Sequence, residues 1–249
     1  MRSPTSGPVE NIAGYLFTHL QSLETRAQAL RILCEQLALK GTILLAPEGI
    51  NLFLAGSSGA IASFLTTLQS DPTFVEFKVK RSYSEAAPFA RMKVKLKQEI
   101  VPLGANNLDP NRAPAPRMRS AQLKRWLDEG RRFILLDTRN RFEFHHGTFN
   151  GAIDLNIEKF RDFPDAVQQQ RARLENLPIV TFCTGGIRCE KAAPLLQKLG
   201  FRDVYQLDGG ILKYFEEQGQ AHYHGSCFVF DERTGLDGEL SAIEPSSSA

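Results

Sequence analysis

The sequence has few cysteines, no long apolar run and little net charge, and each shortage excludes a class of protein. Four cysteines in 249 residues are too few for a disulfide framework, and none forms a C-x-x-C pair, so we expect no metal site. No stretch is apolar enough to span a bilayer, and the N-terminal residues lack the apolar core of a secretory signal peptide. We therefore expect a cytoplasmic protein without membrane contact. The net charge of +2 gives no argument for a nucleic-acid partner. The cysteines are Cys34, Cys183, Cys189 and Cys227.

The chain is expected to hold two domains. The stretch GANNLDPNRAPAPRMR lacks apolar periodicity and is rich in proline, asparagine and arginine, which predicts a linker. The predicted segments are a flexible N-terminus at 1–10, a first domain at 11–104, the linker at 105–119, a second domain at 120–222 and a C-terminal tail at 223–249. We expect the last residues of that tail, from GLDGEL onward, to be disordered.

The first domain is predicted to have the element order strand, helix, strand, strand, helix, strand. IAGYLFTHL predicts a strand, and apolar residues at three- and four-residue steps predict a helix over 22–40. GTILLAPEGINLFLAGS predicts two strands joined by a tight turn, and Ser57 or Ser58 is expected to cap a helix that runs to Gln69. FVEFKVKRS and ARMKVKLKQEIV alternate apolar and polar residues. This βαββαβ order favours a ferredoxin-like α+β sandwich.

The second domain alternates strands and helices. Its strands FILLD, PIVTF and DVYQL are almost continuously apolar, which is typical of a parallel sheet covered by helices on both faces. The overall class is therefore α/β.

The stretch TFCTGGIRCEKAAPLL places Cys183 directly after an apolar strand, where open α/β sheets bind their ligands. The loop that follows has little bulk, and its two glycines let backbone N–H groups converge on the Cys183 sulfur. These groups, the next helix N-terminus and the Arg188 guanidinium should lower the pKa of Cys183 and make it a nucleophile. The alternative is a buried cysteine that only packs. The loop residues are Thr184, Gly185, Gly186 and Ile187.

CTGGIR resembles the active-site loop of the rhodanese domain, in which the first cysteine can carry a persulfide. The stretches ILLDTRNRFEFHHGTFNGAIDLNI and GFRDVYQLDGGILKY are similar to other parts of that domain, over about residues 120–220. In addition EGIN, PFARMKVKLKQEIVPLG, DTRN, CTGGIRCEK and CFVFDER occur in the order found in the tRNA uridine hydroxylases, a subfamily with a ferredoxin-like domain ahead of the rhodanese domain. Many relatives have a further cysteine after CFVFDER, but this chain has none after Cys227.

The resemblance implies oxygen-dependent conversion of the wobble uridine of tRNA to 5-hydroxyuridine, with Cys183 as the catalytic cysteine and dioxygen as co-substrate. We find no dinucleotide-binding fingerprint and no metal-ligand spacing, so no cofactor is evident. Our hypothesis is that the Cys183 thiolate adds to uridine C6 and that C5 then reacts with dioxygen, while Arg188 and the loop amides stabilise the charge. Full hydroxylation by a Cys183→Ser protein would exclude it.

A row of four cations fits a tRNA partner. The residues alternate along one predicted strand and so share one face, about 7 Å apart, where they could follow a phosphate backbone. Charge alone equally fits an edge strand protected from aggregation by lysines, and the resemblance favours tRNA. The row is Arg91, Lys93, Lys95 and Lys97.

Other residues near the loop have more ordinary interpretations. Asp137 and Arg139 are expected to brace a strand end, with Glu143 as a candidate partner. Cys189 is a candidate resolving thiol for oxidised Cys183, or a residue of helix packing, and Glu190 is expected to complement the helix dipole. The aromatic candidates for base stacking are expected to be core residues, and none is assigned to the site: Phe142, Phe144 and Tyr214.

Two other functions remain open. The loop suits a sulfurtransferase of the thiosulfate type, with Cys183 cycling through a persulfide, although such an enzyme does not need the N-terminal domain. A tRNA- or protein-binding module with an inactive rhodanese domain ranks last, because Cys183 is present. The oligomeric state does not follow from the sequence.

Overall fold

The computed structural model describes residues 8–104, 108–112, 114–229 and 235–241. It divides into two compact units, 1–101 and 102–249. Parts of three predicted segments lie outside the described residues, namely most of the flexible N-terminus, part of the linker and most of the end of the tail. The last four letters of the CFVFDER motif also lie outside them.

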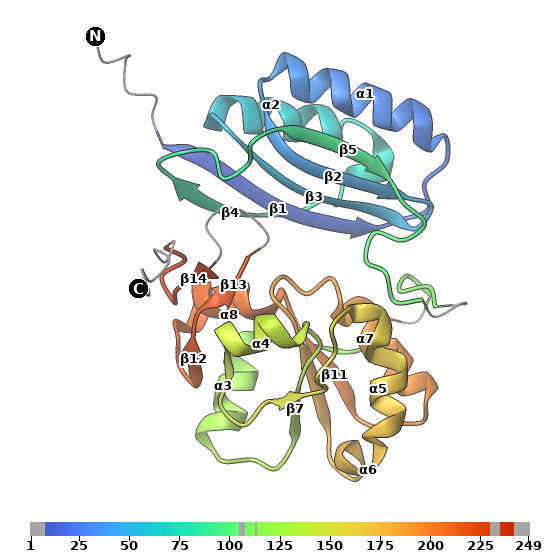
Figure 1. Cartoon of the computed structure of the whole chain (residues 1–249), viewed down its shortest axis with the longest axis vertical. Coiled ribbons are helices and arrows are strands. Elements are labelled where there is room, and N and C mark those ends of the chain that lie inside the picture. Colours follow the sequence, from blue (N-terminus) through green and yellow to red (C-terminus); the bar gives the residue numbers. More distant parts are fainter. Residues whose placement is uncertain (1–7, 105–107, 113, 230–234, 242–249) are drawn as a thin grey trace. The chain divides into compact units, whose positions relative to one another are not determined.

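The first unit has the predicted ferredoxin-like order and adds one strand. Its sheet has the order β4-β1-β3-β2-β5, in which β5 pairs parallel to β2 and all other pairs are antiparallel. Both helices cover one face of this sheet (Figure 1). The elements are β1 (Val9–Phe17), α1 (Leu23–Gln36), β2 (Lys40–Ala46), β3 (Gly49–Gly56), α2 (Ser58–Gln69), the 3-10 turn η1 (Pro72–Phe74), β4 (Val79–Ser84) and β5 (Met92–Leu96).

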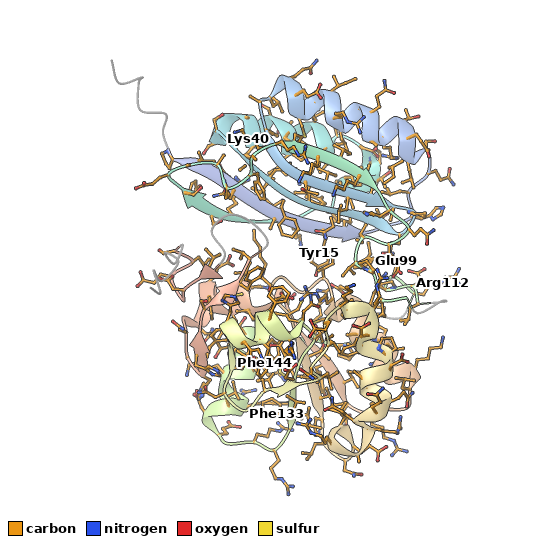
Figure 2. The ribbon with its side chains drawn as sticks, in the orientation of Figure 1. Tyr15, Lys40, Glu99, Arg112, Phe133 and Phe144 are labelled. Atoms are coloured by element: carbon orange, nitrogen blue, oxygen red, sulfur yellow. The ribbon has the colours of Figure 1, made fainter. Side chains whose placement is uncertain are left out.

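The core of the first unit lies between that sheet face and the helices. Ala27, Leu30 and Cys34 of α1 are buried there, as the three- and four-residue spacing predicts. The Ser57 hydroxyl accepts the N–H of Ala60 at 3.3 Å and so caps α2. Tyr15 lies on the opposite face of the sheet (Figure 2).

The second unit is built on an all-parallel sheet of order β6-β11-β10-β7-β9, which confirms the predicted fold class. Helices α5 and α7 cover one face, and α3 and α8 cover the other (Figure 1). The strands of the sheet are β6 (Arg117–Met118), β7 (Ile134–Asp137), β9 (Ile153–Asp154), β10 (Ile179–Phe182) and β11 (Val204–Leu207). The helices are α3 (Ser120–Asp128), α4 (Arg141–His146), the 3-10 turn η2 (Phe160–Asp162), α5 (Phe163–Gln169), α6 (Arg171–Leu174), α7 (Cys189–Lys198) and α8 (Gly210–Gln218).

The second unit extends beyond the segment predicted for it at both ends. Arg117 and Met118, assigned to the linker by sequence, form β6 and pair with β11. Residues assigned to the tail form short strands, of which one pairs with β8 (Gly147–Phe149), and Cys227 is fully buried in the core. Gly235 and Leu236 are also paired, where the sequence suggested disorder. These strands are β12 (Tyr223–Gly225), β13 (Cys227–Phe228) and β14 (Gly235–Leu236).

Candidate functional site

The loop after β10 wraps around the sulfur of Cys183. Cys183 follows the central strand at its carboxyl end, and α7 begins six residues later at Cys189. Gly186 has a φ of 99°, a conformation that suits glycine, and its N–H donates to the Cys183 Sγ at 3.1 Å. Gly185 has no positive φ and a Cβ there would meet nothing within 4 Å. Of the two glycines in the loop, only Gly186 is therefore needed for this turn.

The surroundings of Cys183 favour its thiolate. Burial raises the pKa of a thiol, and Cys183 is only 1% exposed. Four contributions outweigh burial and lower the pKa of Cys183 to about 6: the hydrogen bond from the Cys189 thiol, the charge of Arg188, and the backbone N–H groups of Arg188 and Gly186. Burial and the adjacent Cys183 raise the pKa of Cys189, so Cys189 keeps its proton. The site therefore pairs a thiolate with a thiol.

Arg188 is held beside the thiolate by a buried carboxylate. The two guanidinium nitrogens bind Glu143 of α4, with Nη1–Oε1 at 3.1 Å and Nη2–Oε2 at 2.8 Å. Glu143 is fully buried and also accepts the N–H of Asn140, the N-cap of its own helix, at 3.1 Å. Burial lowers the pKa of Arg188, but the charges of Glu143 and Cys183 raise it by more than burial lowers it. The net pKa is therefore above its ordinary value, and the guanidinium stays charged. A two-point contact of this kind fixes its orientation.

Asp137 and Arg139 form a separate ion pair at the end of β7. The guanidinium Nη2 lies 2.6 Å from Asp137 Oδ2 and 2.7 Å from the Gly147 carbonyl oxygen, and the Thr148 hydroxyl donates to the same carboxylate at 2.9 Å. The sequence offered Glu143 as a candidate partner of this brace, but Glu143 binds Arg188 instead. The prediction was wrong because Glu143 lies one helical turn past the brace, on the side of α4 that faces the cysteine loop.

Two segments that sequence analysis did not connect to the site also contact the loop. The N-terminal N–H groups of α8 donate to the loop carbonyls, from Ile211 to Cys183 at 2.9 Å and from Leu212 to Thr184 at 3.1 Å. A Cβ on Gly210 would lie 2.3 Å from the Cys183 carbonyl oxygen, so only glycine allows this approach. In the sequence, the Gly-Gly pair at the start of α8 is the feature that could have indicated this contact. From β13, the Phe228 carbonyl accepts the Thr184 hydroxyl at 3.4 Å, which no local pattern indicates.

Glu190 does more than complement the dipole of α7, because it binds two side chains of neighbouring strands. Its carboxylate binds Arg117 Nη2 at 2.6 Å and Gln206 Nε2 at 3.1 Å, although it is only 5% exposed. Arg117 also lies 3.4 Å from Asp208. These contacts tie the first turn of α7 to β6 and β11, and so fix the helix that follows the loop.

The aromatic candidates divide into core and surface. Tyr214 is fully buried, as expected of a core residue. Phe142 is 41% exposed and packs edge-on against Phe228 at 5.0 Å between ring centroids, and the His146 ring lies 5.2 Å from Phe228. Because Phe228 also binds Thr184, this group of rings adjoins the cysteine loop.

The four cations of the predicted row share one face of the first unit's sheet. Strand β5 is an edge strand, and Met92 and Val94 pack against the core beneath the helices, so Lys93 and Lys95 face the other way. Arg91 and Lys97 flank β5, but their backbones still bond to β2, at Gly41 and Leu45. The alternation of β5 therefore extends to Arg91 and Lys97 along this edge strand.

The part of the chain that the structure describes contains no group of three histidine, cysteine, aspartate or glutamate side chains placed to hold a metal ion together. Within the same residues, no helix is long and apolar enough to cross a membrane.

Comparison with protein families agrees with the two units. Residues 9–100 match the model of the UPF0176 acylphosphatase-like domain, and residues 120–217 match the model of the rhodanese-like domain. The first of these matches covers the unit with two helices on a mixed sheet, and the second covers most of the unit with the all-parallel sheet.

Similar proteins extend over almost the whole chain. A tRNA uridine(34) hydroxylase of Cupriavidus taiwanensis is 51% identical over 95% of this chain and 86% of its own length. The proteins of the same name from Bordetella avium and Variovorax paradoxus are 50% and 51% identical, over 94% and 96% of this chain and 99% and 93% of their own lengths. With such identity across both units, the chain belongs to the tRNA uridine(34) hydroxylase family.

Proposed function

We propose that this protein hydroxylates uridine 34 of tRNA at C5, with dioxygen as co-substrate and Cys183 as the nucleophile. One observation carries the proposal: a family membership that spans both units coincides with a thiolate, lowered in pKa to about 6, at the carboxyl edge of the rhodanese sheet. Since tRNA is the proposed substrate, we also propose a cytoplasmic location.

The first step uses the electron-poor C6 of uracil. The Cys183 thiolate bonds to C6, and the electron pair of the C5=C6 double bond moves onto C5 and, by conjugation, onto O4. The enolate carbon C5 then bonds to dioxygen, and the outer oxygen takes up a proton. Loss of the C5 proton breaks the C6–S bond, which returns the thiolate and leaves a hydroperoxide on C5. Reduction by two electrons and two protons gives 5-hydroxyuridine and water.

The residues around Cys183 suit the charges that this sequence of steps creates. Arg188 carries a permanent positive charge and is held in place by Glu143, so it stabilises the thiolate before addition and the enolate after it. The Gly186 N–H, 3.1 Å from the sulfur, stabilises the thiolate when it leaves. Among the described residues, the Asp137–Arg139 pair makes no hydrogen bond to the sulfur of Cys183 or Cys189. We assign it the structural role of fixing the end of β7.

The row of four cations is the proposed contact with the tRNA backbone. It lies along an edge strand of the first unit, and single charges at alternate positions match the repeat of a phosphate chain.

The test is nucleoside mass spectrometry of tRNA incubated with wild-type or Cys183→Ser protein. With air, the wild type should add one oxygen to uridine 34, and without oxygen or without Cys183 it should add none. Sulfur transfer is the second candidate, because a sulfur that accepts N–H donors also suits a persulfide. Failure to modify tRNA, together with persulfide formation on Cys183 from thiosulfate, would select that candidate.

A further inference from the structure

The hydroxylation proposed above leaves one requirement open, which is the source of two electrons. Dioxygen brings two oxygen atoms, only one enters the product, and the other must leave as water. Two thiols that become one disulfide release two electrons and two protons, which matches this requirement. The protein holds a second thiol at the site.

The loop binds both cysteines through one residue. Gly186 donates its N–H to the Cys183 Sγ at 3.1 Å, and its carbonyl oxygen accepts the N–H of Cys189 at 3.0 Å. The segment from Cys183 to Cys189 therefore folds back on itself, and its two ends lie on either side of Gly186.

The sulfur of Cys189 lies at the same strand end as Cys183. It is 3.8 Å from the Thr138 hydroxyl oxygen, and that hydroxyl donates at 2.9 Å to the carbonyl of Phe182, the residue before Cys183. Each of the two thiols shifts the pKa of the other, and both side chains are at most 1% exposed.

We propose that Cys189 is the redox partner of Cys183, and that this pair supplies the two electrons that cleave the O–O bond of the uridine hydroperoxide. The inference rests on the proposed hydroxylation. The released Cys183 thiolate attacks the outer oxygen of the hydroperoxide, so the O–O bond breaks and Cys183 becomes a sulfenic acid. The C5 oxygen takes a proton and becomes the hydroxyl group of 5-hydroxyuridine. Cys189 then attacks the Cys183 sulfur, and a disulfide forms as water leaves. A small external dithiol restores both thiols by exchange.

Cys34 provides a control. Cys34 is buried in the core of the first unit. Burial, followed by the charge of Glu35, raises the pKa of Cys34 to about 12, so it takes no part in exchange near neutral pH. Cys34→Ala is therefore the matched variant, since it also removes one buried thiol and leaves the site unchanged.

The experiment is a single turnover without reductant. Protein reduced with dithiothreitol and then freed of it is mixed in air with excess tRNA that carries uridine 34. Product is counted by nucleoside mass spectrometry, and the state of each cysteine is read by peptide mass spectrometry. We expect wild type and Cys34→Ala to stop after one product per protein, with one Cys183–Cys189 disulfide formed for each product, and to resume when dithiothreitol is added. Cys189→Ser should form no disulfide and should accumulate Cys183 sulfenic acid, which a thiol-free trapping reagent such as dimedone labels.

Two results would overturn the pairing. Repeated turnover by the wild type without any reductant would show that the electrons come from elsewhere, and so would product formation with both cysteines left as thiols. In either case product is made, so hydroxylation itself stands. Absence of product even with dithiothreitol present would instead count against the proposed function, and the two failures are therefore distinct.

Discussion

The ion pair of Asp137 and Arg139 should be among the most costly contacts to break in the second unit. Asp137 is 1% exposed and its carboxylate meets only donors: Arg139 Nε at 2.9 Å, Arg139 Nη2 at 2.6 Å, the Arg139 N–H at 3.0 Å and the Thr148 hydroxyl at 2.9 Å. Asn in place of Asp137 keeps the size, but turns an NH2 group toward those donors and leaves a buried cation without its counter-charge. Breaking a buried pair in this way costs about 3–5 kcal/mol.

A second ion pair in the same unit has the same N–O distance but is exposed, so it separates the effect of burial on stability from the effect of distance. Arg171 and Glu175 also lie 2.6 Å apart, but their side chains are 38% and 41% exposed. An exposed pair of this kind is worth only about 0.5 kcal/mol, because water screens the charges and the side chains lose freedom. Glu175→Gln is thus the matched control for Asp137→Asn.

Urea unfolding followed by tryptophan fluorescence measures both. The chain has a single tryptophan, Trp126, and it lies in the core of the second unit, so the signal reports on that unit. With a slope of about 2 kcal/mol per molar urea, the midpoint should fall by roughly 1.5–2.5 M for Asp137→Asn and by roughly 0.25 M for Glu175→Gln. Equal shifts in the two variants would refute the argument that burial decides the contribution of these pairs.

Four further predictions concern the site and the first unit. The ultraviolet thiolate absorbance of wild type minus Cys183→Ser should titrate near pH 6, and Arg188→Gln should raise that midpoint; the midpoint should lie instead near the ordinary pKa of a thiol if the loop is inert. Because the pKa of Cys183 is lower in the folded state, the stability it contributes is complete above about pH 8.5 and is lost as pH falls through about 6, which unfolding at several pH values can check. Replacing Lys93 and Lys95 by Gln should raise the KM for tRNA, leave kcat unchanged and reduce the salt slope of binding by about 0.7–0.9 for each phosphate that is no longer neutralised, whereas aggregation with an unchanged KM would favour edge protection. Ser57→Ala should lower the free energy of unfolding of the first unit by about 1 kcal/mol in thermal or urea unfolding, through loss of the α2 cap.

The sequence predicted those features that depend on neighbours along the chain. The strand before Cys183, the glycine turn and the helix after it are all specified by residues close along the chain. The position of the thiol at the carboxyl end of a strand could therefore be predicted. The βαββαβ order followed from periodicity in the same way. One strand start was placed too early, because Asp71 caps a 3-10 turn at Pro72 and carries Phe74 and Phe77 into the core before β4 begins.

Contacts between distant segments could not be predicted in the same way. Glu143 and Arg188 are 45 residues apart, and only the packing of α4 beside the loop brings them together. The burial of Cys227 likewise depends on the pairing of β12 with β8 and of β13 with β14, from a segment whose composition resembles a tail. Charge, composition and period carry no information on which distant partner a residue meets.

The most direct test of the account is hydrogen exchange at C5 of uridine 34 without oxygen. If Cys183 adds to C6, the enolate carbon should take a proton from solvent and then lose either hydrogen as the thiolate leaves. In D2O under argon, wild-type protein should therefore place deuterium on C5 of uridine 34, and Cys183→Ser should not. Nucleoside mass spectrometry of the recovered tRNA reads the result. Deuterium in both samples, or in neither while the wild type hydroxylates normally in air, would contradict addition by Cys183.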